Sequence, residues 1–149
     1  MAGTVIRTAR ANDLTRLVEL DTVAQSEEGR IRAIGRWVEL GQCFCAEYDG
    51  LIAGYGVLHN YFFERPFLEM LMVDEALRGR GFGPALVAHA AHSCGASQLW
   101  TSTNASNLVM RRLLNRLGFT HAGTIYGLDE GDPELVFCVE TDGFEHFPE

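Results

Sequence analysis

The 149 residues are enough for one domain with one sizeable core and too few for two ordinary domains, so we expect residues 1–149 to form a single domain. Hydrophobic residues make up 47% and charged residues 21%, close to the average for globular proteins, which excludes a disordered chain. The formal net charge is −8 and all 12 basic residues are Arg, which excludes Lys-dependent phosphate loops, argues against a nucleic-acid partner and favours a cationic substrate.

The first half of the chain predicts a strand, two helices and a hairpin. The expected elements are a strand over residues 4–8, a helix that follows Asn12 or Asp13, a helix over 27–40, and strands over 43–48 and 51–62. The second helix carries Ile31, Ile34 and Val38 on one face, at helical spacing. Asp49-Gly50 is a strong signal for a two-residue turn between the two strands.

The second half begins with a nearly unbroken apolar run over residues 67–73, which is typical of a central strand covered on both faces. The elements expected after it are a helix over 84–93, a strand over 98–103, a helix over 104–117, and strands over 119–126 and 135–141. The order βααβββαβαββ predicts an α/β fold, a mixed sheet with helices on both faces.

A glycine-rich segment separates the strand 67–73 from the next helix, with the sequence Arg78-Gly79-Arg80-Gly81-Phe82-Gly83. Unpaired backbone amides at a helix N-terminus, the helix dipole and the two Arg charges suit a phosphate group. The structural alternative is a tight turn with solvent-facing arginines. The GxGxG spacing, the position in mid-chain and the lack of an acidic residue in 98–103 exclude the dinucleotide fingerprint.

This segment resembles the pyrophosphate loop of the GNAT superfamily of N-acetyltransferases, R/Q-x-x-G-x-G/A, with Arg78, Gly81 and Gly83 at its fixed positions. Downstream, Asn107 followed by Arg116-Leu117-Gly118-Phe119 resembles the second motif of that family, an Asn-led helix that ends in x-G-F. The resemblance runs over the whole chain. It implies the GNAT acyl-CoA N-acyltransferase fold with a mostly antiparallel sheet.

The resemblance also implies a cofactor, acetyl-CoA, whose pyrophosphate would lie on the backbone amides of residues 78–83. The strand residues Leu71, Met72 and Val73 would pair with its pantetheine arm. Asn107 would face the cofactor, or would only cap the helix. Pro84 departs from the family pattern, because the expected first residue of the helix has no N–H to donate.

The catalytic residues are less clear from the sequence. Many family members use a Tyr four residues before the Gly of x-G-F as general acid, and Leu114 stands there. Tyr126, our candidate, and Tyr61 are the hydroxyls expected to reach the cleft instead. Glu69 is the only charge in residues 67–73, and strand alternation places it on one face with Leu71 and Val73.

Burial on that face would raise the pKa of Glu69 and suit a base that takes the proton of an amine. The alternative is a Glu paired with Arg65 or another arginine. His59 lies in a strand with no evident partner, and His89, His92 and Cys94 are expected on a helix surface. We expect no metal site, because no metal-ligand spacing occurs, and no disulfides, because no CxxC pair or secretory context occurs.

We therefore expect an N-acetyltransferase that moves an acetyl group from acetyl-CoA to an amine of a small molecule or peptide. The alternative is a non-catalytic acyl-CoA-binding or sensing domain of the same fold, because of Leu114 and Pro84. The acidic run 129–134 is either a solvated turn or a lip for a cationic substrate. The resemblance implies a homodimer, and the lack of an apolar span predicts a cytoplasmic protein with no membrane partner.

Overall fold

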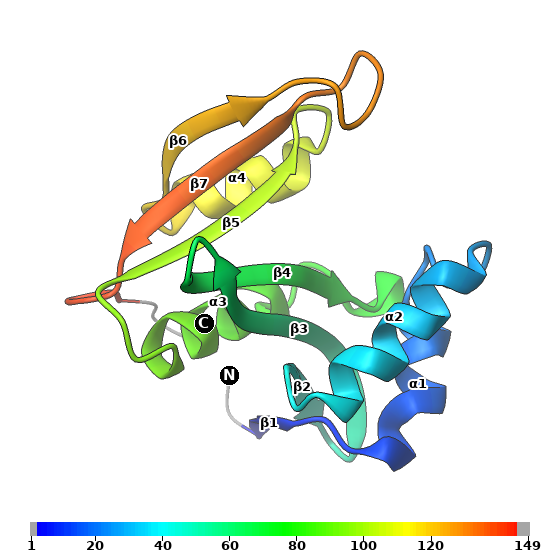
Figure 1. Ribbon diagram of the computed structural model, residues 1–149. Coiled ribbons are helices and arrows are strands. Elements are labelled where there is room, and N and C mark those ends of the chain that lie inside the picture. The colour runs from blue at the N-terminus through cyan, green and yellow to red at the C-terminus, as the bar shows by residue number, and fades with distance from the viewer. Residues whose placement is uncertain (1–2, 146–149) are drawn as a thin grey trace.

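One sheet of seven strands organises residues 3–145, the part of the chain that the computed structural model describes (Figure 1). The strands are β1 (Thr4–Thr8), β2 (Cys43–Tyr48), β3 (Leu51–Phe62), β4 (Arg65–Val73), β5 (Gln98–Asn104), β6 (Thr120–Ile125) and β7 (Glu134–Glu140), in the spatial order β1-β2-β3-β4-β5-β7-β6. The helices are α1 (Leu14–Leu20), α2 (Glu28–Glu39), α3 (Phe82–Ser93) and α4 (Leu108–Arg116), with 3-10 turns η1 (Ala11–Asp13) and η2 (Glu75–Leu77). All neighbouring strands are antiparallel except β4 and β5. The expected element order is confirmed.

Two helix starts differ from the sequence-based expectation. α3 begins at Phe82, so Pro84 is its third residue and not its first. The first N–H groups of a helix have no intrahelical acceptor, so Pro84 breaks no helical hydrogen bond. α4 begins only at Leu108, because Asn104 still belongs to β5 and Asn107 caps the helix by accepting from the Met110 N–H at 3.1 Å.

The sheet carries a separate apolar core on each face. α3 and α4 pack on one face against side chains that include Leu68, Leu99 and Phe137. α1 and α2 pack on the other face of β2, β3 and β4, against side chains that include Tyr55 and Val57. Helices therefore cover both faces on the β1–β4 side of the sheet, whereas on the β5–β7–β6 side only α4 is seen, on one face (Figure 1).

A buried carboxylate joins the α1–α2 connection to the sheet. Asp21 has no solvent exposure and accepts hydrogen bonds from the Tyr55 hydroxyl on β3 at 2.5 Å and from the Val23 and Ala24 amides. Arg30 on α2 forms an ion pair with it at 3.0 Å. Burial and this carboxylate raise the pKa of Tyr55, so the phenol stays a donor. The connection is therefore held in one conformation beside β3 and β4.

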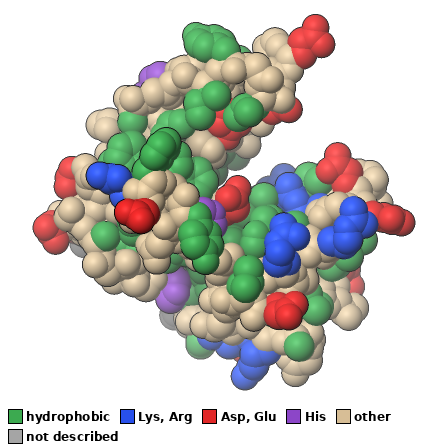
Figure 2. Space-filling model, viewed as in Figure 1, with side chains coloured by type: hydrophobic (Ala, Val, Ile, Leu, Met, Phe, Trp, Pro, Cys, Tyr) green, Lys and Arg blue, Asp and Glu red, His purple; other side chains and the backbone are tan. Residues whose placement is uncertain are grey.

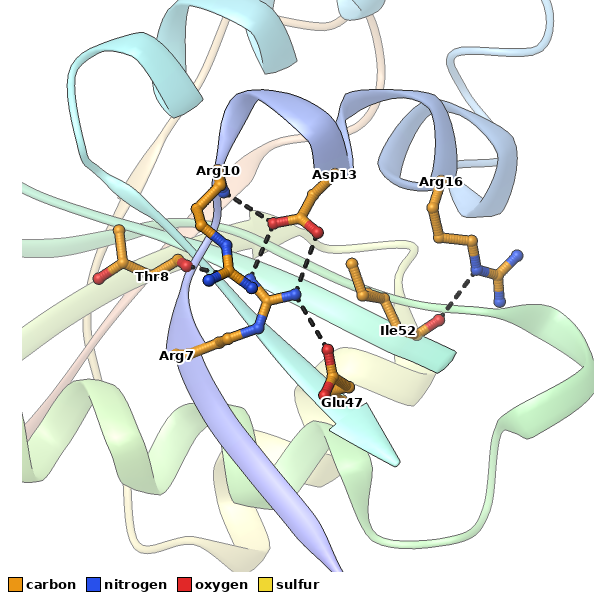
Figure 3. A network of polar contacts seen from close by, with 7 residues as sticks. All are labelled: Arg7, Thr8, Arg10, Asp13, Arg16, Glu47 and Ile52. Carbon is orange, nitrogen blue, oxygen red and sulfur yellow. Dashed lines mark hydrogen bonds and ion pairs between the residues drawn. The ribbon is translucent and has the colours of Figure 1, made fainter. Parts of the chain in front are cut away.

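A second polar network closes the edge of the sheet at β1 (Figure 3). Arg7 donates to both carboxylate oxygens of Asp13, at 2.8 and 3.0 Å, and to Glu47 on β2 at 3.0 Å. Asp13 also accepts from the Arg10 N–H at 2.7 Å. The hydrogen bond from Arg7 is the main reason that the pKa of Asp13 lies below its usual value. Ionised Asp13 therefore stabilises the fold.

We expect Asp13→Asn to lower the free energy of unfolding by about 2 kcal/mol at neutral pH, because Arg7 loses the charged partner that accepts two of its hydrogen bonds. The lowered pKa of Asp13 means that its contribution is complete at neutral pH and is lost as the pH falls below about 4. Urea unfolding at both pH values checks this, since the deficit of the variant should shrink in acid. Glu47→Gln, at the more exposed partner, should cost much less; an equal loss would contradict this account.

Candidate active site

The parallel strands β4 and β5 pair over only two residue pairs, Phe67 with Trp100 and Leu68 with Thr101. The Thr101 hydroxyl, which is buried, donates to the Leu68 carbonyl at 2.8 Å and joins the strands at the last pair. Beyond that point β4 and β5 diverge (Figure 1). Figure 2 shows the resulting hollow between the two parts of the molecule, with acidic and histidine side chains at its inner end. The inner end of this hollow is the candidate site.

A β-bulge in β4 places Glu69 at that inner end. Val57 on β3 pairs with Met70 and the next residue, Leu58, pairs with Leu68, so Glu69 has no partner on β3. Such an extra residue reverses the alternation of side chains beyond it.

The expected face of Glu69 is therefore wrong. Leu71 and Val73 pack into the core under α3 and α4, whereas Met70 and Met72 pack toward α1 and α2. Glu69 does not share a face with Leu71 and Val73, because the bulge at Glu69 breaks the alternation of side chains along β4.

The Glu69 side chain is 44% exposed, so the expected burial is also wrong. Its Oε1 contacts Nε2 of His59 at 2.9 Å, which identifies the partner that the sequence did not reveal. Arg65, the partner considered from the sequence, instead donates to the Phe63 carbonyl at 3.0 Å. Glu69 and His59 meet because the bulge turns Glu69 toward the sheet face on which His59 of β3 lies.

The hydrogen bonds of His59 determine which ring nitrogen carries the proton. The Tyr61 backbone N–H donates to Nδ1 of His59 at 3.0 Å, so Nδ1 is unprotonated in this arrangement. A neutral ring then carries its hydrogen on Nε2 and donates it to Glu69. One carboxylate oxygen of Glu69 is thereby held by His59, and the other oxygen can accept a proton from a molecule in the hollow.

The edge of β4 that faces the hollow has no strand partner beyond Leu68 among the described residues. Leu71, Met72 and Val73 pair with β3 along the other edge only. Arg78 turns back toward this edge and donates from Nε to the Val73 carbonyl at 3.2 Å. The exposed edge therefore runs from Glu69 to the start of the glycine-rich segment.

The glycine-rich segment forms the N-terminus of α3. Gly79 and Gly81 have φ values of 79° and 88°, the left-handed region that favours glycine, and Gly81 is the N-cap. The first helical hydrogen bond runs from the Ala85 N–H to the Gly81 carbonyl at 3.2 Å. Within residues 3–145 the backbone amides of 79–83 have no hydrogen-bond acceptor. Converging free amides beside Arg78 and Arg80 fit an anionic phosphate group.

An ion pair fixes the start of this segment. Asp74 caps η2 by accepting from the Ala76 N–H at 2.9 Å, and Arg16 on α1 contacts it at 2.6 Å. These two interactions, the backbone hydrogen bond first, lower the pKa of Asp74. Arg16 also donates to the Ile52 carbonyl at 3.0 Å, so α1, β3 and the start of the glycine-rich segment are tied together.

Several predicted site residues lie elsewhere or have other roles. Asn107 caps α4, as the structural alternative proposed. Leu114 is fully buried in the core and faces no cleft. Tyr126 directly follows β6 and is 79% exposed. His89 packs against Phe44 with the ring centroids 4.9 Å apart. Within the described residues no group of side chains could hold a metal ion.

The acidic run between β6 and β7 is tied to β5 and to the turn that follows it. Asp129 accepts from the Asn104 side chain at 2.9 Å, and Asp132 accepts from the Ser106 amide at 3.0 Å. The Ser102 hydroxyl donates to Glu134 at 2.6 Å. Ser102 is the first β5 residue beyond the last pair with β4, and Glu134 pairs with Asn104 at the far end of β5. The acidic run is therefore a connection held to β5 by hydrogen bonds, and not only a solvated turn.

The family model described as acetyltransferase (GNAT) family matches residues 11–119. The chain belongs to the GNAT family of acetyltransferases. A GNAT-family acetyltransferase from Bacillus cereus is 28% identical, with a TM-score of 0.85, 92% of this chain covered and 96% of that chain. A search of curated proteins finds no match.

Two more distant solved structures show the same fold. The ribosomal-protein-S18-alanine N-acetyltransferase from Escherichia coli is 18% identical, with a TM-score of 0.75 over 98% of this chain and 97% of that one. A putative acetyltransferase from Salmonella typhimurium, solved with acetyl-CoA, is 20% identical, with a TM-score of 0.71 over 99% and 98% of the two chains. The expected family and fold are confirmed.

As a GNAT acetyltransferase, the protein uses acetyl-CoA as its acetyl donor, which confirms the expected enzyme class and cofactor. The GNAT loop and Glu69 lie at the two ends of one exposed strand edge. None of the described helices has the length and apolar character needed to span a membrane.

The Thr101 hydroxyl should stabilise the point where the two GNAT strands separate. We expect Thr101→Val to lower the free energy of unfolding by about 1 kcal/mol, because it removes the hydrogen bond to the Leu68 carbonyl. Thr103→Val is a matched control on the same buried face of β5 and should change stability little. Urea unfolding measures both variants, and equal stabilities for the two would contradict the role of this bond.

Proposed function

We propose that this acetyltransferase transfers the acetyl group of acetyl-CoA to the amine of a small molecule or peptide, with Glu69 as the base. The observation that carries the proposal is the arrangement along β4. A carboxylate held by His59 lies at one end of its exposed edge, and the free amides of residues 79–83 lie at the other. A donor bound along this edge brings its thioester to the carboxylate.

The backbone amides of residues 79–83 would hold the pyrophosphate of the donor, with Arg78 and Arg80 adding positive charge. Pro84 offers no amide, so binding rests on its neighbours. The exposed edge of Leu71, Met72 and Val73 would hold the pantetheine arm by backbone hydrogen bonds, as in the addition of a strand. When bound, acetyl-CoA supplies the activated acetyl group. Asn107 would contribute by fixing the start of α4.

Glu69 would prepare the acceptor for attack. An amine in water at neutral pH is mostly protonated and cannot act as a nucleophile until its proton is removed. The free carboxylate oxygen of Glu69 accepts that proton, while the hydrogen bond from His59 Nε2 holds the carboxylate in place. Because Nδ1 of His59 is engaged by the Tyr61 amide, the ring does not compete for the proton.

The leaving thiolate also needs a proton, and Leu114 cannot supply one. We propose Tyr126 as the donor; Tyr61, whose ring stacks on His59 with the centroids 5.3 Å apart, is the second candidate. Tyr126→Phe and Tyr61→Phe, compared by their maximal rates, separate the two. We also infer a cytoplasmic location. We infer a homodimer as well, and analytical sedimentation would test this oligomeric state.

Gly81→Val should abolish acetyl-CoA binding, because a β-branched residue cannot adopt φ 88° without distorting the segment. Gly95→Val is the matched control, since Gly95 also has a positive φ of 72° and lies after α3, away from the segment. Both variants lose stability, but only Gly81→Val should lose the rise in melting temperature with acetyl-CoA. A normal rise in Gly81→Val would refute the assignment of the segment.

Glu69→Gln should lower turnover of an amine acceptor by about 100-fold, because the base is lost, and leave KM for acetyl-CoA unchanged. The loss should be largest at low pH and should shrink as the pH rises, because less of the amine then needs deprotonation. Release of free coenzyme A over a panel of amines is the measurement. Glu64→Gln in the β3–β4 turn is the control, and equal rates for both variants would remove Glu69 as base.

The same assay tests the alternative of a sensing domain. Acetyl-CoA that raises the melting temperature, with no release of coenzyme A for any amine, would favour binding without transfer.

A further inference from the structure

A row of aromatic rings runs across the sheet from Glu69 to β5. Its members, each in contact with the next, are Tyr61, His59, Phe67, Phe62 and Trp100, with successive centroid distances of 5.3, 5.8, 4.8 and 5.6 Å. The second ring, His59, is the one that holds the Glu69 carboxylate. The row therefore begins beside the proposed base and ends at Trp100 on β5, which pairs with Phe67 where the two strands are still joined.

The row borders a cavity of about 470 Å³ on the sheet face that α4 does not cover. Its apolar lining includes Phe62, Phe63, Trp100, Ile125 and Val136. Val136 pairs with Ser102, the first β5 residue beyond the contact with β4, so the cavity extends toward the inner end of the hollow. Phe62 at the cavity packs on Phe67, which packs on His59 beside Glu69, so the aromatic row connects the cavity to the proposed base.

Phe63 at the edge of this cavity is unusual for its place in the chain. It is 77% exposed and has φ 51°, and the next residue, Glu64, has φ 62°. A two-residue turn with both φ values positive favours Asn and Gly, and a bulky aromatic side chain there is strained. Residues held in such conformations cluster at functional sites. Within the fold the Phe63 ring packs edge to face on Phe62, with the centroids 5.0 Å apart, and a ligand in the cavity would contact its exposed part.

The carboxylates on the two arms of the hollow complement a cation. Glu69 is held by His59 on one arm, and Glu134 is held by Ser102 on the other. Arg65, the cation beside the cavity, donates to the Phe63 carbonyl. An ammonium group near the carboxylates is favoured by charge, and aromatic faces favour both apolar groups and cations. A polar polyamine would leave the aromatic row uncovered.

We propose that the acceptor is a primary amine carried on an aromatic or bulky apolar body, which lies in this cavity while its amine reaches Glu69. The inference rests on the proposed acetyl transfer and specifies its acceptor class. Recognition of the body comes from apolar contact with Phe62, Phe63 and Trp100, and recognition of the amine comes from Glu69.

The first test compares two acceptors in the coenzyme A release assay, 2-phenylethylamine and ethanolamine. We expect kcat/KM to be at least about tenfold higher for 2-phenylethylamine. Ethanolamine used as efficiently as 2-phenylethylamine would overturn the acceptor class and leave the proposed transfer intact. No release with any amine would instead count against the proposed transfer.

The second test uses Phe63→Asn, since Asn tolerates a positive φ. This variant should melt at a higher temperature than the parent and yet show about a tenfold higher KM for 2-phenylethylamine, with KM for ethanolamine unchanged. Leu51→Asn, an exposed apolar residue at the far end of β3, is the matched control and should leave both KM values unchanged. Equal effects of Phe63→Asn on the two acceptors would overturn the proposal.

A binding measurement decides the matter without turnover. The sequence has 2 Trp residues, so Trp37→Phe leaves Trp100 as the sole indole. In the presence of coenzyme A, 2-phenylethylamine should change the fluorescence of Trp100 in a saturable manner, and ethanolamine should not. No change at millimolar 2-phenylethylamine would overturn the site, whatever the transfer assay gives.

Discussion

The whole site depends on how little β4 and β5 are paired. Parallel strands joined side by side along their length would leave no space for a ligand, whereas here pairing stops after Leu68 and Thr101. The backbone N–H and C=O groups along an unpaired strand edge need hydrogen-bond partners. The hollow leaves this edge of β4 open, so that water or a ligand can supply them. The Thr101 hydroxyl and the aromatic row hold the strands together where pairing ends.

Ion pairs on one side and hydrogen bonds on the other fix the segments that border this hollow. Asp21 fixes the α1–α2 connection to β3, and Arg16 joins α1 to Asp74 at the start of the glycine-rich segment. On the other side, the acidic run is held to β5 through Ser102 and Asn104. The buried Asp21 and the partly buried Asp74 each have an Arg partner, which is the condition under which charges can leave water. The connections that border the hollow are thus anchored to neighbouring strands and helices.

Much of the fold could be predicted because its signals are local. Asp49-Gly50 marks a turn by its own backbone preference, and helical spacing of apolar residues marks an amphipathic face without reference to the rest of the chain. The family motifs around Gly81 and Asn107 are local in the same sense. The catalytic geometry was harder, because a β-bulge leaves no mark in a continuous apolar run. Assumed alternation therefore put Glu69 on the wrong face and hid His59, ten residues away in sequence.

By itself the sequence determined the order of elements and the segment suited to a phosphate, since these follow from neighbouring residues and their backbone preferences. The GNAT family and its donor came from the resemblance of local motifs. Only the tertiary structure decided that β4 contains a bulge, that His59 holds Glu69, and that Phe62, Phe63 and Trp100 border one cavity. These features depend on the register between strands, which is set by the packing of both sheet faces at once. A one-residue shift in that register moves every side chain beyond it to the other face.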